Sequence, residues 1–388
     1  MRIGVMLRTL DEQGGVAVYS RNLVHALLDA DRFNEYELFY RSETHLGQFA
    51  RQANVREHVI RARGKALWDQ VAIPRACRDR HVEVLLHPKF TLPLLTRVPS
   101  VMVVHGADWF LPEAARFYGR LDRAYMRVFM PLYLRRAAAV ISVSRLTTDD
   151  FERLFSLPKG KVQTVYFGAA QHFRRVNDAA ALAHIRAKYR LPERFILTLS
   201  KRAGDTRKNM RRLFDAYERM HDQVPHKLVV GGLGCERFRD DYGLPAAGWG
   251  RDVIFPGYLD QADLPAIYSL CELYLYPSNQ EAFPIPIAEA MACGVPIVTS
   301  AANGLQEIAG EAAVLVDPGD VGAIAEASLQ VLTDPALSAR LSAAGLARSR
   351  VFSWETCARR TLEILEAVGG DGAPNRRDMA AGHGGRHQ

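Results

Sequence analysis

Short apolar runs alternate along most of the chain with longer segments that carry apolar residues every three or four positions. The runs are typical of strands buried in a parallel sheet, and the longer segments are typical of amphipathic helices. The first half is predicted to form helices at residues 16–29, 65–80 and 114–136, with a kink or break at Pro74. Its predicted strands are residues 2–7, 36–40, 82–86, 101–104, 140–143 and 162–167.

The same alternation starts again after a predicted linker at residues 168–177. Strands that alternate with helices predict an α/β protein with doubly wound parallel sheets, and 388 residues are enough for two such domains. Residues 369–388 are rich in Gly, Ala and Arg, which predicts a disordered tail. The predicted strands of this half are residues 195–199, 226–230, 253–255, 273–276, 297–298 and 313–316, and the predicted helices are residues 178–189, 264–269, 287–293, 321–333, 335–348 and 354–368 with another from Met210.

Residues 273–300 read LYLYPSNQEAFPIPIAEAMACGVPIVTS and are predicted to form a strand–loop–helix–strand unit. The loop joins the carboxyl end of a strand to the amino end of a helix, which is where open α/β sheets bind ligands. The unsatisfied N–H groups and partial positive charge of that helix end favour a phosphate. Glu281 lies in the loop, and Glu289 follows about one turn into the helix, within reach of sugar hydroxyls. The unit therefore predicts a site for a nucleotide sugar.

Two further candidates lie at the ends of predicted strands in the first half. Gly14 and Gly15 separate the strand of residues 2–7 from the next helix, and glycines in such a loop let backbone N–H groups approach a phosphate. A Gly-Gly pair alone is weak evidence, because it is also compatible with a simple tight turn. His105 follows the strand of residues 101–104 at its carboxyl end, where a ligand is expected.

The stretch EAFPIPIAEAMACGVPIVTS closely resembles the E-x7-E signature of the retaining glycosyltransferases of family 4, commonly E-G-F-G-L-P-x-x-E-A-M-A-x-G-x-P-V-V. The resemblance covers most of the chain, from the Gly-Gly loop through SKRAGDTRKN at residues 200–209 to the Pro-Gly-Asp turn at residues 318–320. One departure is Pro284, which stands where the family commonly has glycine. Because proline has no N–H, a backbone contact with phosphate would fall to Phe283 and Ile285.

The resemblance implies the GT-B fold, in which two doubly wound Rossmann-like domains face each other across a cleft. Residues 1–170 would form the acceptor-binding domain, and residues 171–352 would form the domain that binds the nucleotide sugar. The helix of residues 353–368 would cross back to the first domain, ahead of the tail at residues 369–388.

The same resemblance implies roles for individual residues. Lys208 would stabilise the departing diphosphate together with Arg202 or Lys201, since the loop here carries one extra residue. The other implied roles are backbone contacts with the donor at Gly14 and Gly15, the donor-sugar hydroxyls at Glu281, the ribose at Glu289, the nucleobase side at Tyr258, and orientation of sugar and acceptor at His105.

A second departure follows His105. The family commonly reads V-x-H-D, whereas Gly106 comes next here and Asp108 lies two residues further on. Whether Asp108 replaces the missing acid is left open by the sequence. Two fixed cations facing a diphosphate suit a metal-independent transferase, because they supply the charge that Mg²⁺ would otherwise bring. We therefore expect no metal and no cofactor beyond the co-substrate, GDP-mannose or UDP-glucose.

Cysteine usage and hydropathy predict the compartment. The five cysteines are scattered, odd in number and never form a C-x-x-C pair, which is typical of reduced thiols in a cytoplasm. The first residues do not resemble a signal peptide, and no run approaches the ~20 apolar residues that span a bilayer. We expect a cytoplasmic protein, located at the inner face of the membrane if it also contacts lipid.

The net charge of +7 is unevenly placed: residues 1–190 hold 30 Lys and Arg against 18 Asp and Glu, and residues 191–388 hold 20 against 25. The basic half predicts peripheral contact with an anionic membrane or lipid-linked acceptor, although an arginine-rich solvated surface explains the charge equally well. No nucleic-acid-binding motif is present, so we expect no nucleic-acid partner. In the predicted helix 114–136, one face carries Arg116, Arg120, Arg123 and Arg127, and another carries Phe117, Leu121, Val128 and Leu132.

These observations predict a retaining, metal-independent glycosyltransferase that moves a hexose from a nucleotide sugar to a hydroxyl of a glycan or lipid-linked acceptor. One alternative is an epimerase-like enzyme on the same fold, in which water replaces the acceptor. A second is a non-catalytic protein that binds nucleotide sugars, which the departures at Gly106 and Pro284 favour. The third, a nucleic-acid-binding protein, is suggested by charge alone.

Overall fold

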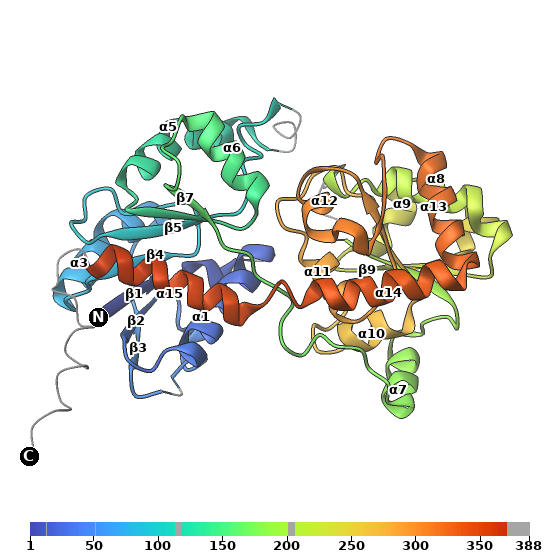
Figure 1. The fold of residues 1–388 in the computed structure, drawn as a ribbon, viewed down its shortest axis with the longest axis horizontal. Helices are drawn as coiled ribbons and strands as arrows, with labels where there is room; N and C mark the ends of the chain where they lie inside the picture. Colours follow the sequence, from blue (N-terminus) through green and yellow to red (C-terminus); the bar gives the residue numbers. More distant parts are fainter. Residues whose placement is uncertain (13, 51, 113–117, 201–205, 371–388) are drawn as a thin grey trace, which may run out of the picture.

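The computed structural model describes residues 1–12, 14–50, 52–112, 118–200 and 206–370. They form two sheets in which every strand pairing is parallel (Figure 1). The first sheet has the order β3-β2-β1-β4-β5-β6-β7, and the second has the order β10-β9-β8-β11-β12-β13. The strands are β1 Arg2–Met6, β2 Glu35–Tyr40, β3 Val55–Val59, β4 Val84–His87, β5 Ser100–Val104, β6 Ala139–Ser142, β7 Val162–Thr164, β8 Phe195–Leu199, β9 Lys227–Gly231, β10 Val253–Ile254, β11 Leu273–Tyr276, β12 Ile297–Ser300 and β13 Val314–Val316.

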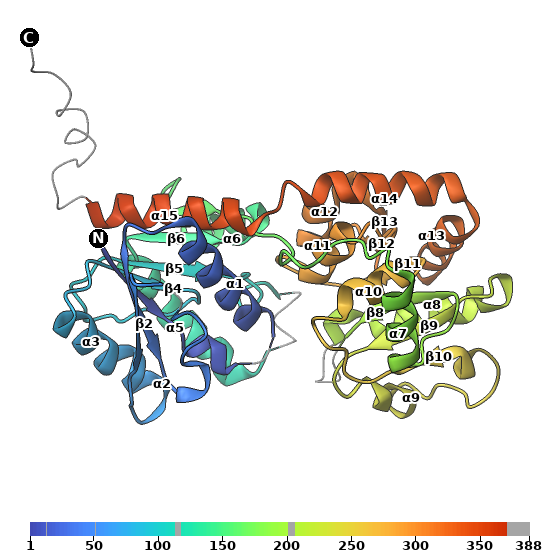
Figure 2. The ribbon, with the colours of Figure 1, turned by 90° about the horizontal axis from the view of Figure 1, so that it is seen from below.

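Helices cover both faces of each sheet (Figure 2). In β5, Val101 and Val103 belong to one apolar core, whereas Met102 and Val104 belong to another. Successive strand residues point to opposite faces, so a strand covered on both sides must be apolar throughout. The helices are α1 Gly15–Ala30, α2 Gly64–Leu67, α3 Ile73–Asp79, α5 Arg120–Arg136, α6 Arg145–Phe155, α7 Ala179–Tyr189, α8 Met210–Met220, α9 Phe238–Asp241, α10 Leu264–Leu270, α11 Ile285–Ala292, α12 Asn303–Ala309, α13 Val321–Thr333, α14 Pro335–Ser349 and α15 Trp354–Gly370.

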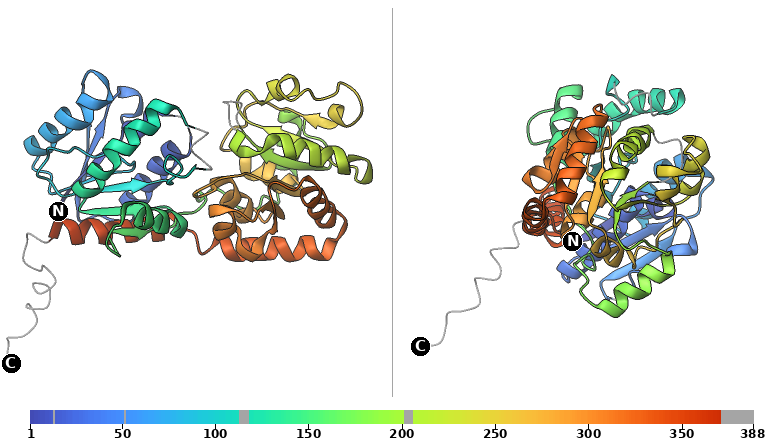
Figure 3. Two further views of the ribbon diagram at one scale, coloured as in Figure 1. Left: turned by 90° about the horizontal axis from the view of Figure 1, so that it is seen from above. Right: turned by 90° about the vertical axis from the view of Figure 1, so that its right-hand side faces the viewer.

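The last helix, α15, returns to the first sheet, where it packs against α1 and strands β4 to β6. Figure 3 shows α14 and α15 in succession along one side of the two sheets. An aromatic cluster lies at the crossing point, where the Phe167 and Phe283 rings stack with centroids 3.9 Å apart and Trp354 lies 4.9 Å from Phe167. Phe283 belongs to the loop of the E-x7-E segment, so this cluster joins that loop to the first domain.

A carboxylate of the second domain caps a helix of the first. Glu307 of α12 accepts hydrogen bonds from the backbone N–H groups of Arg145 and Leu146 at 2.7 and 2.9 Å. These two residues begin α6, whose N–H groups at that end have no partner within the helix. Glu307 also accepts a bond from the Tyr166 hydroxyl at 2.7 Å. The negative carboxylate at the positive end of a helix stabilises this arrangement of the domains.

The structure contradicts two local predictions and adds one strand that was not predicted. Pro74 does not break its helix, because a π-helical turn at Trp68–Ala72 precedes it and the chain continues into α3. Such a turn shifts the hydrogen-bond register where proline lacks an N–H. Strand β3 was not predicted: it is a half-buried edge strand in which charged residues interrupt the apolar pattern. The predicted helix 114–136 is not continuous, since α5 begins only at Arg120, after an extended Gly119.

The apolar face of α5 also differs from the prediction. The helix buries Met126, Met130, Tyr133 and Leu134. The predicted apolar residues Leu121, Val128 and Leu132 are 87%, 61% and 40% exposed instead. The helix therefore has two apolar faces, and only one of them packs on the sheet. Among the helices that the structure describes, none is both long and apolar enough to cross a membrane.

Candidate active site

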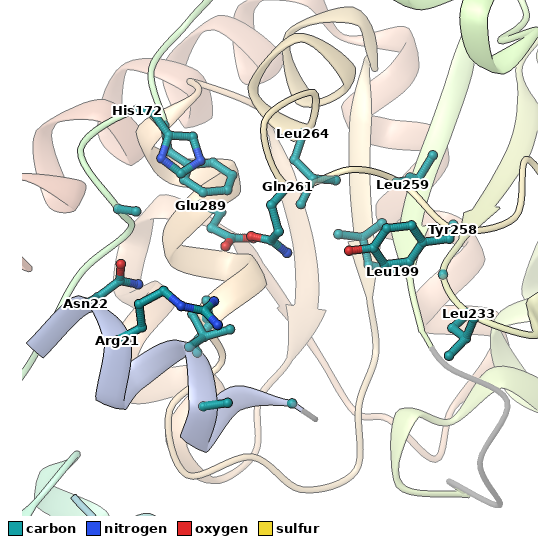
Figure 4. A pocket seen from close by; sticks show the side chains of 18 of the residues that line it. Arg21, Asn22, His172, Leu199, Leu233, Tyr258, Leu259, Gln261, Leu264 and Glu289 are labelled. Carbon is teal, nitrogen blue, oxygen red and sulfur yellow. The ribbon is translucent and has the colours of Figure 1, made fainter. Parts of the chain in front are cut away.

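A cavity of about 820 Å³ lies between the two domains and takes its walls from both. Its size is that of a small-molecule site. Helix α1 supplies Arg21 and Asn22 on one side, and the loop after β10 supplies Tyr258 on the other (Figure 4). Gln261 and Glu289 point into the space between them (Figure 4). We call this space the interdomain cavity.

Two helix N-termini from different domains meet beside the cavity. Helix α1 begins at Gly15 after Gly14, whose φ of +118° suits glycine, and a Cβ on Gly15 would lie 3.7 Å from the Ile285 side chain at the start of α11. Both helix ends carry partial positive charge, so together they favour an anion. In α11, Pro284 and Pro286 have no N–H. Among residues 284–286 at the start of the helix, only Ile285 therefore has a backbone N–H that could donate a hydrogen bond to a phosphate.

Glu289 is a buried acidic group of the cavity. It lies one turn into α11 and is only 5% exposed. Its Oε2 accepts a hydrogen bond from the Tyr268 hydroxyl at 3.2 Å. Burial raises the pKa of Glu289 to about 8, an effect that the Tyr268 bond opposes only in part. Glu289 is therefore protonated at neutral pH in the cavity as it stands.

Glu281, in the loop between β11 and α11, is held as a carboxylate by a network of donors. Lys208 Nζ lies 2.6 Å from Glu281 Oε1, and the hydroxyls of Tyr276 and Ser278 reach the same oxygen at 3.0 and 3.2 Å. Burial by itself would raise the pKa of Glu281. The charges of Lys208 and Arg207, with the hydrogen bonds, lower it overall. Lys208 also bonds to the Tyr276 hydroxyl, so the ammonium and the carboxylate are fixed together.

Asp108 reaches across from the first domain to the second. Its carboxylate lies 3.5 Å from Arg207 Nη1 and accepts a bond from Gln280 Nε2 at 3.3 Å. Burial raises the pKa of Asp108, and Arg207 is the main group that opposes this. Gly106 has a φ of +140°, and a Cβ there would lie 3.2 Å from the Ala282 Cβ. A side chain in place of Gly106 would thus be strained, whereas Asp108 brings an acid to the same place.

His105 is a neutral hydrogen-bonding group. Its Nε2 lies 2.9 Å from the Pro88 carbonyl oxygen, and because a carbonyl can only accept, Nε2 carries the proton. Burial lowers the pKa of His105 to about 4, with the Pro88 bond opposing the shift. Nδ1 is then an acceptor at neutral pH. The Tyr19 ring packs edge-on against the imidazole, with centroids 4.7 Å apart, and holds its orientation.

Glycines after β9 shape the far wall of the cavity. A Cβ on Gly232 would lie 1.6 Å from the Ser200 carbonyl oxygen, and one on Gly231 would lie 2.3 Å from Leu259. Only glycine lets these loops approach so closely. Tyr258, 61% exposed, stands at this wall after Gly257, so an aromatic face is available to a nucleobase.

The structure brings most of the predicted residues together. Gly14, Tyr258, Ile285 and Glu289 line the interdomain cavity. Glu281 and Lys208 form a pair, and Asp108, three residues after His105, contacts their neighbours Gln280 and Arg207. Phe283 packs in the aromatic cluster of the domain crossing. Lys201, Arg202, Arg116 and Phe117 lie outside the described residues.

Sequence reasoning missed several residues of the site. Arg207 could have been found, since it precedes Lys208 in the R-K-N segment. Three other residues belong to no sequence motif, and only the fold places them at the site: Arg21, Gln261 and Gln280.

Two family profiles match consecutive parts of the chain. Glycosyltransferase Family 4 matches residues 13–169, and Glycosyl transferases group 1 matches residues 183–348. The chain belongs to the family 4 type of group 1 glycosyltransferases. The predicted family is confirmed, and the protein is an enzyme of the glycosyltransferase class.

Relatives of this glycosyltransferase are themselves named transferases. O-antigen chain mannosyltransferase B of Escherichia coli is 28% identical over 396 residues, which cover 91% of this chain and 96% of that protein. The serotype-specific mannosyltransferase WbdA of Escherichia coli is 31% identical over 238 residues, covering 59% of this chain and 28% of that longer protein.

Solved structures confirm the predicted GT-B fold. Sucrose-phosphate synthase from Thermosynechococcus elongatus superimposes with a TM-score of 0.75 at 22% identity, covering 95% of this chain and 99% of that one. Anabaena HepE, in complex with UDP and glucose, gives 0.75 at 19% identity, with 95% and 100% covered.

Proposed function

We propose that the enzyme transfers mannose from GDP-mannose to a hydroxyl of a glycan, with retention at the anomeric carbon and without a metal. The observation that carries this proposal is the fixed Lys208–Glu281 pair, whose Glu281 lies in the loop that leads into α11, together with the facing N-termini of α1 and α11. Two named relatives that act as mannosyltransferases favour mannose, and the UDP and glucose bound to HepE make UDP-glucose the second candidate.

Each group of the site has a role in this reaction. Lys208 and the two helix ends stabilise the negative charge that grows on the departing diphosphate. Glu281 accepts hydrogen bonds from the donor-sugar hydroxyls, and Glu289 accepts them from the ribose. His105 accepts a hydrogen bond at Nδ1 from a hydroxyl of the donor sugar or the acceptor. Asp108 fills the place of the acid that the family carries after the histidine.

The chemical step needs no protein nucleophile. The bond between the anomeric carbon and the diphosphate oxygen breaks, while the acceptor oxygen bonds to the same face of that carbon. The acceptor proton passes to the departing phosphate oxygen. Glu281 is engaged by Lys208 and two hydroxyls, which suits a carboxylate that orients the sugar rather than one that attacks it.

The test is a transfer assay with GDP-mannose or UDP-glucose, an α-mannoside acceptor, and EDTA or Mg²⁺. We expect GDP-mannose to be consumed, an α-linked product to form, and the rate in EDTA to stay within about twofold of the rate with Mg²⁺. GDP at about one hundred times its dissociation constant should stabilise the protein by ~2.7 kcal/mol in a thermal shift. Use of UDP-glucose alone, a β-linked product, or loss of activity in EDTA would each remove one part of the proposal.

We also propose that the first domain contacts the cytoplasmic face of a membrane through α5, where a lipid-linked acceptor would be presented. Leu121, Val128 and Leu132 form an exposed stripe at spacings of seven and four, next to the exposed Arg120 and Arg127. A helix with an exposed apolar stripe beside basic residues is typical of a membrane-surface helix.

Sedimentation with vesicles tests this contact. We expect the protein to bind vesicles that contain phosphatidylglycerol and to bind neutral phosphatidylcholine vesicles more weakly. Leu121→Ser combined with Val128→Ser should weaken binding more than about tenfold, because two apolar side chains no longer enter the lipid. Val351→Ser removes an exposed apolar residue outside α5 and serves as the control. Equal binding by both variants would disprove the contact.

A further inference from the structure

A second cavity of about 810 Å³ lies within the first domain, on the inner side of α5. Helix α5 supplies Tyr125, Met126, Phe129 and Tyr133 to its wall, and the opposite side comes from the segment after β4 and from the α2 region. This aromatic cavity is separate from the interdomain cavity, and no residue lines both.

Aromatic rings dominate the walls of the aromatic cavity. Trp109 packs between Phe90 and Tyr118, with centroids 4.9 and 4.8 Å away. On α5 the Tyr125 and Phe129 rings stack at 4.6 Å. The hydroxyls of Tyr125 and Tyr133 lie 2.7 Å apart. A pyranose has apolar ring faces and hydroxyl groups. Flat aromatic rings with polar tips can pack against those faces and hydrogen-bond to those hydroxyls.

The charged groups of the aromatic cavity are already paired. Arg8 makes two bonds to the Asp69 carboxylate at 2.7 and 2.9 Å, and both residues are buried. Lys89 bonds to both oxygens of Glu12 at 2.8 and 2.7 Å, and Lys65 lies 3.6 Å from the same carboxylate. A third acid, Asp122, lines the wall. The three cations of the described wall therefore already have carboxylate partners, one of which, Glu12, lies outside this wall.

One side-chain bridge connects the aromatic cavity to the interdomain cavity, and another connects it to the second domain. Glu12, the partner of Lys89, lines the interdomain cavity itself. At a second point, the Tyr118 hydroxyl bonds to Asp108 at 3.1 Å, and Asp108 faces Arg207 of the second domain. The aromatic cavity therefore lies next to the interdomain cavity, on the side of the first domain.

We infer that the aromatic cavity binds the acceptor, and that the unit it binds is a neutral saccharide rather than a phosphorylated one. This inference rests on the proposed function. The aromatic rings pack against the apolar faces of the sugar. The paired charged side chains donate hydrogen bonds to the sugar hydroxyls and accept hydrogen bonds from them. A phosphate would have to displace Glu12 or Asp69 from its cation, which costs a buried ion pair.

The experiment compares Trp109→Leu and Phe129→Leu with the wild-type enzyme, using a neutral mannoside acceptor and its phosphorylated counterpart. Leucine keeps apolar volume but removes the ring. We expect the KM for the neutral acceptor to rise about tenfold in each variant, with little change in the KM for the donor. Slow transfer of the sugar to water, which needs no acceptor, should stay within about twofold, as should the thermal shift caused by the nucleotide. The wild-type enzyme should prefer the neutral acceptor.

Several outcomes would overturn the inference. One is an unchanged acceptor KM in both variants. Another is equal or better use of the phosphorylated acceptor by the wild-type enzyme. A KM that depends on the lipid tail of the acceptor and not on its sugar would assign the cavity to lipid instead. Asp122→Asn supplies a second probe, because the loss of one exposed carboxylate should improve use of the phosphorylated acceptor. Transfer to water and nucleotide binding test the proposed function without the acceptor. Failure of the acceptor-site inference can therefore be distinguished from failure of the proposed function.

Discussion

Replacing Lys208 with methionine should lower kcat by about 10²- to 10³-fold, the loss found when one preorganised group at a developing charge is removed. The Lys208 ammonium is fixed by the Glu281 carboxylate and the Tyr276 hydroxyl, so it needs no reorganisation when the diphosphate departs. Methionine keeps much of the length of the side chain but carries no charge. Initial rates at saturating donor and acceptor measure the effect.

The same substitution should also destabilise the fold, because Glu281 remains buried without its cation. Its pKa, which Lys208 and Arg207 now hold down against the effect of burial, should rise. Adding Glu281→Gln to Lys208→Met should recover much of the melting temperature, because no unpaired carboxylate then remains buried, and this recovery measures the structural part of the effect. Lys227→Met, which removes a lysine paired with Asp252 on the same domain at 3.3 Å, is the control. A kcat within twofold of wild type in Lys208→Met would refute the assigned role.

The sequence predicted the sheets well because strands covered on both faces must be apolar throughout. Strand β11 has the predicted limits, Leu273 to Tyr276, and all four of its residues are buried. Strand β3 escaped prediction for the same reason, since an edge strand with one half-exposed face has no continuous apolar run. The sequence alone does not show which apolar face of α5 is buried, because the helix carries two, and the structure places Met126 and Met130 in the core.

Site residues divide in a similar way. Glu281 and Glu289 lie in one strand–loop–helix unit, so their spacing and the resemblance to the family could point to them. Partners that come from another domain are invisible in local sequence. Asp108 and Arg207 are 99 positions apart, yet their side chains meet at 3.5 Å because the domains close on each other. The aromatic cavity is another such case, since its rings come from separate segments that only the fold brings together.

The second large effect concerns Glu289 and the dependence of stability on pH. The pKa of Glu289 is about 8 in the folded protein, whereas an unfolded glutamate titrates near 4.5. Between these values the folded state binds one more proton than the unfolded state. The free energy of unfolding should therefore fall as pH rises through this range, by at most ~1.4 kcal/mol per pH unit from this residue. Glu289→Gln has no proton to lose and should lack this contribution.

Urea unfolding of both proteins at pH 5 to 9 measures that difference. We expect Glu289→Gln to be close to wild type in stability at pH 5 and clearly more stable at pH 8, after which the difference should stop growing. Glu311→Gln, which replaces an exposed glutamate, is the control and should follow wild type. A difference between Glu289→Gln and wild type that does not change with pH would show that burial does not keep Glu289 protonated.

Donor binding should favour the ionised form of Glu289, whereas folding favours the protonated form. A ribose diol is bound best by the ionised carboxylate, because charge-assisted hydrogen bonds are the stronger ones. Binding of the donor then releases the Glu289 proton, so wild-type affinity should increase up to about tenfold per pH unit below pH 8. Glu289→Gln should bind donor at least about tenfold more weakly at pH 8 and show no such slope. Glu289 would thus both lower the stability of the protein without donor and make donor binding depend on pH. Titration calorimetry of wild type and Glu289→Gln at pH 6, 7 and 8 measures this dependence.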